Sequence, residues 1–332
     1  MINLPSWLSF KPFEGLRQDF LGDQRLVSII RLCPGIFGSD FGSVTFVVSN
    51  ARSSGGRAVY RRLFDQHDNV RFVATIEALL HDRDYNLFEV AQSDFAAIPG
   101  SPVIYWLSEK MRAAFASGKP LRSIASLAVG LQTGDNNRFL RQWWEVSTNR
   151  TAFSCTSREE ATNSGARWFP YNKGGEFRKW YGNQEHVVNW ENDGAEIIAF
   201  KPRSVIRNPG TYFSPSVSWS KISSGSPAFR SYPPGFIYDV AGTSIFAENN
   251  RERLEQLSFT NSTLAQEQLS AIAPTLNFEV GQVAGLPIAD LSSDSCSMLA
   301  AQAVKTARED WDLFETSWNF LNNPLIELMQ RG

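Results

Sequence analysis

The chain has 332 residues, of which 42% are hydrophobic and 20% are charged, and its formal net charge is −2. This composition is typical of a globular protein with two or more domains, and it excludes a disordered chain and a strongly basic protein that binds nucleic acid through net charge alone. No run of about 18 apolar residues occurs, so we expect no membrane span. Cys33, Cys155 and Cys296 lie far apart and form no CxxC pair, which predicts a reduced, cytoplasmic protein.

Residues 1–50 are predicted to be the end of an α/β sheet. Met1–Trp7 is predicted to be a short strand, Phe13–Leu21 a helix, and Leu26–Leu32 and Val44–Val48 two further strands. These elements do not close a doubly wound sheet by themselves, so we expect that an N-terminal partner of this sheet is missing.

The next segments are less regular. The Ser- and Gly-rich residues 51–60 predict a loop or hairpin connection, and Val103–Ala116 predicts a helix that ends before Gly118. Residues 252–272 and 295–321 also predict helices. The second of these is predicted to have one buried stripe: Leu299, Val304, Ala307, Trp311, Phe314 and Trp318.

Between Ile124 and Phe246 the sequence predicts short strands separated by turns such as Gly134-Asp135 and Gly174-Gly175. Residues 129–240 carry 13 Lys and Arg against 10 Asp and Glu, whereas residues 241–332 carry 5 against 12. The mildly basic middle permits DNA binding, and the acidic last part indicates a solvated or partner-facing surface.

The sequence lacks the signatures of several catalytic sites. His67, His81 and His186 are isolated from one another, so they predict neither a metal site nor a Ser-His-Asp triad. No P-loop and no GxGxxG string occurs.

An amino methyltransferase needs an NPPY-type loop, which holds the amino group of a flipped base while its aromatic ring stacks on that base. The nearest strings lack the acceptor or the ring, and no Gly-rich S-adenosylmethionine loop follows a first strand. The sequence therefore predicts no catalytic, cofactor-binding or metal-binding residue, and we expect no methyl transfer by this chain alone. The strings are Asn208-Pro209-Gly210, Tyr232-Pro233-Pro234-Gly235 and Asn323-Pro324-Leu325.

Three segments have the composition of a nucleic-acid contact, and each also has a structural interpretation. Val129–Val146 contains a polar loop of Gly130, Gly134 and Asp135-Asn136-Asn137 that Arg138 and Arg141 follow, or it is an ordinary turn into an amphipathic strand. Trp168–Gly194 mixes seven aromatic residues with basic ones, as in a nucleic-acid groove or in a half-buried strand. Ser214–Phe246 has a strip of hydroxyl groups and one amine that suits contacts to phosphate, formed by Ser218, Ser220, Lys221, Ser223 and Ser224. The alternative interpretation of this segment is a Ser-rich surface loop.

Five strings in these segments and beyond them resemble the PglX family in order and spacing, over about residues 120–327. PglX is the adenine-specific DNA methyltransferase of BREX phage-defence systems and is similar to type IIG restriction-modification enzymes. The strings are GLQTGDNNRF with WWEV, RWFPYNKGGEFRKWYGNQEHVVNWENDG, SWSKISSG with YPPGFIYDVAGTSIF, APTLNFEVGQVAGLPI, and AREDWDLFETSWNFLNNPL. Residues 1–49 also look like the last strands of that family's methyltransferase sheet.

The resemblance implies the C-terminal portion of such an enzyme. Its fold would be the end of a Rossmann-like methyltransferase sheet, an α/β fragment, followed by a β-rich α+β target-recognition domain and C-terminal helices. The implied divisions are 1–50 for the methyltransferase end, 51–122 for a connector, 123–290 for the recognition domain and 291–332 for the helices. The full-length family uses S-adenosylmethionine, whereas the motifs that hold it and the target base lie upstream of the matching region.

The resemblance also implies double-stranded DNA as the partner, with a catalytic methyltransferase chain or other BREX components as further partners. By motif position, nine residues are predicted to lie near DNA: Thr133, Asn136, Arg138, Arg141, Asn172, Lys173, Arg178, Lys179 and Ser220. Two alternatives stay open, namely a trans-acting specificity or regulatory subunit and a non-enzymatic module that binds glycan or protein.

Overall fold

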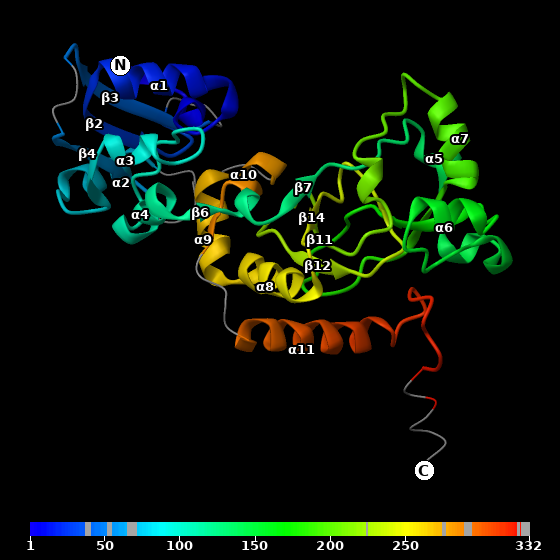
Figure 1. Cartoon of the computed structure of the whole chain (residues 1–332). Helices are drawn as coiled ribbons and strands as arrows, with labels where there is room; N and C mark the ends of the chain where they lie inside the picture. Colours follow the sequence, from blue (N-terminus) through cyan, green and yellow to red (C-terminus); the bar gives the residue numbers. More distant parts are fainter. Residues whose placement is uncertain are drawn as a thin grey trace. The chain divides into compact units, whose positions relative to one another are not determined.

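The computed structural model describes residues 1–36, 41–51, 55–64, 72–223, 225–273, 277–288, 294–323 and 326. The chain divides into two compact units, Met1–Gly118 (unit 1) and Lys119–Gly332 (unit 2), which run from blue to cyan and from cyan to red in Figure 1. Several sheets and helices make it a mixed α/β protein, as predicted. Among the described helices, none has the length and apolar character that a membrane span requires.

Unit 1 is built on a five-stranded sheet in the order β1-β3-β2-β4-β5. Only β2 and β4 pair in parallel, and the other neighbours are antiparallel. The strands are β1 (Ile2–Asn3), β2 (Arg25–Leu32), β3 (Ser43–Ser49), β4 (Arg57–Arg62) and β5 (Leu87–Ala91). The helices are η1 (Pro5–Leu8), η2 (Lys11–Phe13), α1 (Glu14–Asp23), α2 (Val73–His81), α3 (Ser93–Ala96) and α4 (Glu109–Ser117).

The helix and the two longer strands predicted within residues 1–50 are confirmed, but the strand predicted for Met1–Trp7 is wrong beyond Asn3. Pro5 opens a 3-10 helix, because its fixed φ suits a first helical position and it has no N–H for a strand ladder. The helix predicted from Val103 begins at Glu109, where the Ser108 hydroxyl caps it by accepting a hydrogen bond from the Met111 N–H.

The sheet of unit 1 continues past residue 50. The predicted loop or hairpin at residues 51–60 contains the start of β4, while residues 52–54 lie outside the described residues. β4 and β5, which fall in the predicted connector, pair in the same sheet as the strands of residues 1–50. The Rossmann-like origin of that sheet and the division into functional domains remain predictions.

Unit 2 contains two four-stranded sheets, ordered β13-β9-β10-β8 and β12-β11-β14-β7, and a two-stranded sheet of β15 and β6. Its strands are short, as the turn-rich sequence predicted. They are β6 (Lys119–Pro120), β7 (Ser126–Ala128), β8 (Leu140–Gln142), β9 (Trp168–Asn172), β10 (His186–Asn189), β11 (Ser216–Trp219), β12 (Phe229–Tyr232), β13 (Ile237–Tyr238), β14 (Ser244–Phe246) and β15 (Pro287–Ile288).

Helices border these sheets in Figure 1. The 3-10 helices are η3 (Leu121–Ser123), η4 (Trp143–Glu145), η5 (Thr148–Arg150) and η6 (Pro209–Thr211). The α-helices are α5 (Asn136–Phe139), α6 (Arg158–Asn163), α7 (Glu191–Ala199), α8 (Asn250–Asn261), α9 (Thr263–Ile272), α10 (Val280–Ala284) and α11 (Asp294–Trp311).

The long helix α11 packs against α8 and differs in two ways from the prediction (Figure 1). It ends at Trp311 rather than at residue 321, so Phe314 and Trp318 belong to the turns that follow it. Its buried face contains Ala300 and Trp311, whereas Leu299 is 65% exposed. The packing partner α8 selects this face, and the sequence pattern of α11 alone did not identify it.

Most aromatic residues of Trp168–Gly194 are core. Phe169, Tyr171, Tyr181 and Trp190 are buried, and three of them belong to one hydrophobic cluster at the first four-stranded sheet. The structural interpretation of this segment therefore describes most of its rings, while Phe177 is exposed.

Candidate nucleic-acid interface

The polar loop predicted within Val129–Val146 is hydrogen-bonded to the first four-stranded sheet. The Leu131 N–H donates to the Tyr238 carbonyl at 2.8 Å, and Gln132 pairs with Val205 as an isolated bridge. Gly134 has φ +76°, and a Cβ there would lie 2.6 Å from the carbonyl carbon of Arg203. Glycine is therefore the residue that allows both this backbone conformation and this close approach.

Asp135 starts the short helix α5 that follows the loop. Its carboxylate caps the helix by accepting from the Arg138 N–H at 3.1 Å. This cap places Asn136 and Asn137 in an exposed first turn and buries Phe139 behind them. The local sequence thus presents the amides and anchors the loop with one aromatic ring.

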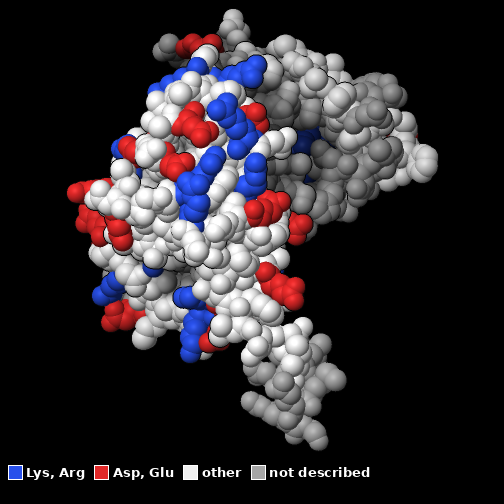
Figure 2. Space-filling view, turned by 90° about the vertical axis from the view of Figure 1, so that its right-hand side faces the viewer, with Lys and Arg blue, Asp and Glu red and all other residues white. Residues whose placement is uncertain are grey.

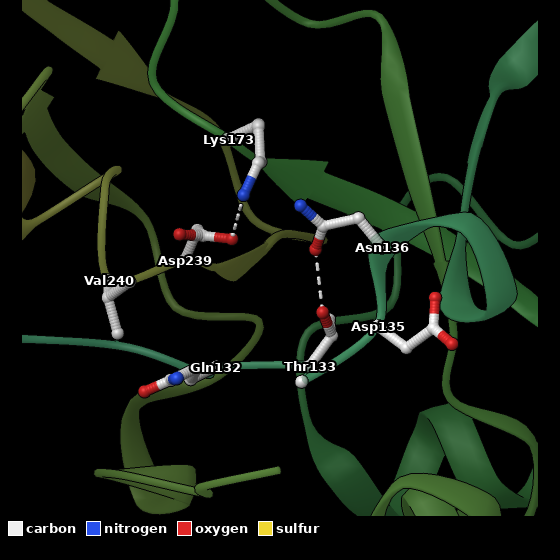
Figure 3. A pocket seen from close by; sticks show the side chains of 8 residues that line it. Gln132, Thr133, Asp135, Asn136, Lys173, Asp239 and Val240 are labelled. Carbon is white, nitrogen blue, oxygen red and sulfur yellow. Dashed lines mark hydrogen bonds and ion pairs between the residues drawn. The ribbon is translucent and has the colours of Figure 1, made fainter. Parts of the chain in front are cut away.

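A hollow of about 230 Å³ lies beside this loop, and Figure 3 shows its side chains. Asn136 and Lys173 also line a second hollow, which extends toward Arg141 and His186. The two hollows therefore adjoin at these side chains. The first hollow is lined by Gln132, Thr133, Gly134, Asp135, Asn136, Lys173, Asp239 and Val240.

A buried polar network forms one wall of the first hollow. β9 and β13 pair in parallel with Asn172 opposite Tyr238, so the residues that follow, Lys173 and Asp239, come out side by side. The Lys173 Nζ donates to Asp239 Oδ2 at 2.7 Å, and the Tyr171 hydroxyl donates to the same oxygen at 2.8 Å. Burial raises the pKa of Tyr171 and the nearby carboxylate raises it further, so the phenol stays a proton donor.

The opposite wall is the Asn136 side chain, held by Thr133. The Thr133 hydroxyl, which is buried, donates to Asn136 Oδ1 at 2.6 Å. In Figure 3 this bond turns the oxygen toward Thr133, and the amide nitrogen points toward Lys173. Thr133 thus orients the amide that the hollow presents.

Two guanidinium groups lie over one ring beside the loop. Arg138 and Arg203 approach Phe200 with their guanidinium carbons 5.2 and 5.7 Å from the ring centroid. Arg138 also forms an ion pair with Glu196 at 3.7 Å, and both arginines are exposed. Exposed, oriented guanidinium groups suit contacts to phosphate oxygens.

Helices α5, α6 and α7 lie on the side of unit 2 that Figure 2 turns toward the viewer. Lys and Arg side chains run through the middle of this face, interrupted by Asp and Glu side chains. Several cations around α7 are paired: Glu191 pairs with Arg150 at 2.7 Å and Asp193 pairs with Arg158. This side of unit 2 is therefore rich in cations but partly neutralised.

The second hollow combines a cation and an imidazole. The Arg141 guanidinium donates to the carbonyls of Asn137 and Leu140, both at 2.6 Å, and lies over the Trp168 ring. His186 is partly buried in the facing strand β10, and this burial lowers its pKa. The imidazole is therefore neutral near pH 7 and can donate or accept a hydrogen bond.

Two of the nine predicted residues are buried supports in the structure. The Asn172 amide donates to the Ser218 hydroxyl at 2.6 Å and to the Gly242 carbonyl at 3.2 Å. The Ser220 hydroxyl donates to the Gly175 carbonyl at 2.7 Å and accepts from Arg230 at 3.1 Å. Both side chains use their polar atoms to join neighbouring segments.

Two more predicted residues have internal partners on the C-terminal helices. Arg178 pairs with Asp310 at 3.3 Å and lies over the Trp311 ring, with its guanidinium carbon 5.0 Å from the centroid. The Lys179 Nζ donates to the Asn261 carbonyl, at the end of α8, at 3.1 Å. Thr133, Asn136, Arg141 and Lys173, in contrast, line the hollows, and Arg138 lies on α5 next to them with its guanidinium over Phe200.

Sequence reasoning missed Asp239 and Arg203. Asp239 joins the hollow only through strand pairing across 66 residues, so no local pattern marked it. Arg203 follows a cis Lys201–Pro202 bond and borders the loop through Gly134. The string Lys201-Pro202-Arg203, two cations beside a turn residue, was a signal that could have found it.

Among the described residues, no group of three or more His, Cys, Asp or Glu side chains is placed to hold a metal ion.

Two curated proteins are similar to the chain over 98% of its length. It is 33% identical over 338 residues to the adenine-specific methyltransferase PglX of Lacticaseibacillus casei (strain Zhang). It is 34% identical over 335 residues to the adenine-specific methyltransferase BrxX of Escherichia coli (strain HS). The matches include only 28% and 26% of those proteins, so the chain spans about a quarter of their length. The predicted resemblance to PglX is confirmed.

No protein-family model matches the sequence. Among solved structures, the type IIL restriction-modification enzyme MmeI, determined in complex with DNA, matches 99% of this chain and 45% of its own, with TM-score 0.50 and 11% identity. The type IIG restriction endonuclease BpuSI matches 93% of this chain and 42% of its own, with TM-score 0.33 and 14% identity. The MmeI match shows a similar fold.

Proposed function

We propose that unit 2 is the DNA target-recognition part of an adenine-specific DNA methyltransferase that acts in phage defence. The contact surface in this proposal is the loop with Thr133 and Asn136, the Lys173 wall of the hollow, and the cations Arg138, Arg141 and Arg203. The observation that carries it is the juxtaposition of an amide-lined hollow with exposed guanidinium groups on Phe200. The amide groups of the hollow suit contacts to base edges, and the exposed guanidinium groups suit contacts to phosphate oxygens.

The comparisons support this proposal at the level of the whole protein. The two curated relatives are named adenine-specific methyltransferases, and MmeI was solved with DNA. In the complete protein, S-adenosylmethionine supplies the methyl group and duplex DNA presents the adenine. We place both the cofactor and the reacting base outside this chain, so that the chain by itself reads DNA and does not methylate it.

The nine predicted residues have different parts in the proposal. The exposed cations and the hollow contact DNA. Asn172 and Ser220 support the segments next to Lys173, and Arg178 and Lys179 attach the module to α11 and α8.

Binding to a pool of short random-sequence duplexes, measured by fluorescence anisotropy over a series of salt concentrations, tests the proposal. We expect the double variant Arg138→Gln, Arg203→Gln to bind about tenfold more weakly than the unmodified chain. Its salt slope should be smaller by roughly two, because each lost phosphate contact removes about 0.9.

The control is the double variant Arg122→Gln, Lys305→Gln, which removes the same charge from exposed positions on η3 and α11. It should bind like the unmodified chain. Equal weakening by both pairs, or binding that does not change with salt, would contradict the proposal.

A further inference from the structure

The first hollow presents hydrogen-bond donors. Asn136 Oδ1 is turned toward the Thr133 hydroxyl, which leaves the two Nδ2 hydrogens on the hollow side (Figure 3). Lys173 has three ammonium hydrogens, and the bond to Asp239 uses one. In Figure 3 the Asn136 amide nitrogen is turned toward Lys173, whose Nζ is directed at Asp239, so both nitrogen groups lie beside the same hollow.

The carboxylates around the hollow are already engaged. Asp239 is 2% exposed; its Oδ2 accepts from Tyr171 and Lys173, and its Oδ1 accepts from the Ala241 N–H at 2.8 Å. Asp135 accepts from the Arg138 N–H, and its carboxylate points away from the hollow in Figure 3. A ligand group that donates hydrogen bonds would therefore meet other donors at the Asn136 and Lys173 walls of this hollow.

The charge of the lining disfavours a phosphate. The ammonium of Lys173 is neutralised by its ion pair with Asp239, and the Asp135 carboxylate points away from the hollow, so no net positive charge faces it. A phosphate would therefore find no net positive charge to stabilise it, whereas a neutral ligand with two adjacent acceptors needs none.

Guanine is the base whose major-groove edge offers two adjacent acceptors, O6 and N7. Adenine replaces one of them with an amino donor, cytosine presents an amino donor, and thymine pairs one acceptor with a methyl group. Donors from two walls match guanine and leave an unpaired donor against each of the other bases.

We propose that this hollow reads the O6/N7 edge of a guanine in the major groove, with Asn136 and Lys173 as specificity-determining residues and Thr133 as the positioning residue for the amide. This inference rests on the proposed function, since it requires that the loop approaches duplex DNA. It adds to that function the identity of one base in the recognition sequence.

The first test is selection of bound duplexes from a random pool by the unmodified chain, followed by sequencing. We expect at least one position fixed as guanine. Replacing that guanine with 7-deazaguanine, which lacks the N7 acceptor, should weaken binding about three- to tenfold. Inosine is the matched control, because it keeps O6 and N7 and should leave binding within about twofold.

The second test changes the amide without changing its shape. Asn136→Asp can still accept from Thr133 but presents an acceptor in place of the Nδ2 donors. We expect it to lose about five- to 100-fold of the preference for guanine and to shift the selected base to cytosine or adenine. Asn163→Asp, at the exposed end of α6, adds the same charge elsewhere and should keep the guanine.

Thr133→Val tests the positioning residue. It has nearly the same shape but no hydroxyl, so the Asn136 amide can turn and offer its oxygen together with its nitrogen, which matches adenine. We expect the variant to bind the selected duplex within about threefold and to accept adenine in place of guanine. If the variant failed to fold, its binding to every DNA sequence would fall instead.

Three results would overturn the inference while the proposed function stands. They are a selected sequence without guanine, a guanine that survives both 7-deazaguanine and Asn136→Asp, and a uniform loss of affinity with a smaller salt slope in Asn136→Asp, which indicates a phosphate contact. If the chain binds no duplex at all, the proposed function fails and this inference fails with it.

Discussion

Replacing Gly134 with alanine tests whether close packing against the Arg203 backbone holds the polar loop in place. Gly134 has φ +76°, a conformation that costs about 1 kcal/mol for alanine. The added Cβ would also lie 2.6 Å from the carbonyl carbon and the carbonyl oxygen of Arg203. Overlap with packed backbone typically costs about 1–3 kcal/mol, so the total loss of unfolding free energy should be about 2–4 kcal/mol.

Gly165→Ala is the matched control, because Gly165 has φ +64° but no atom within 4 Å of its Cβ position. It should lose only the conformational part, about 1 kcal/mol. Urea unfolding followed by tryptophan fluorescence measures both variants, since most of the 10 tryptophans lie in unit 2. Equal losses in the two variants would refute the packing argument.

The same substitution should also weaken duplex binding, because the loop that presents Asn136 must move to relieve the overlap. The Gly165 control should bind as the unmodified chain does. A Gly134→Ala variant that is destabilised but binds DNA normally would show that the loop is not part of the interface.

Three further predictions concern other parts of the chain. Trp318→Ala should lower the free energy of unfolding by about 1–3 kcal/mol and speed amide exchange in the residues after α11. The reason is that the Trp318 ring packs on Phe153 and Phe236, with centroid distances of 4.8 and 5.9 Å. Unchanged exchange would show that these ring contacts do not hold the segment after α11. Burial lowers the pKa of His186 below 6.5, so the unfolded state binds more protons and the unfolding free energy should fall as pH drops from above 6.5 through the folded-state pKa. His186→Asn should make that fall smaller in urea titrations, and an unchanged pH profile would contradict the assignment. Arg17 is 1% exposed and donates to three backbone carbonyls in unit 1. Arg17→Lys should therefore lower the free energy of unfolding by about 2–4 kcal/mol and make unit 1 sensitive to limited proteolysis. Full resistance to the protease would show that Arg17 does not hold these segments together.

The sequence by itself determined that short strands separated by turns, together with a polar loop, occur in unit 2. Turn dipeptides such as Gly134-Asp135 act within a few residues, so their effect can be read locally. The same locality explains the cap of α5 at Asp135 and the exposed amides that follow. The resemblance to PglX could also be read from the sequence, because it rests on the order and spacing of short strings and not on overall composition.

The tertiary structure alone decided which polar side chains line the two hollows. Lys173 meets Asp239 because β9 and β13 pair in parallel and end together. Arg178 and Lys179 look like DNA contacts in sequence, but α11 and α8 supply partners for both. The role of a charged side chain depends on the groups within a few ångströms of it. Here these groups belong to strands and helices that are far away in sequence. For that reason the donors of Asn136 and Lys173, which form the proposed recognition surface, could be placed beside one hollow only from the pairing of the strands.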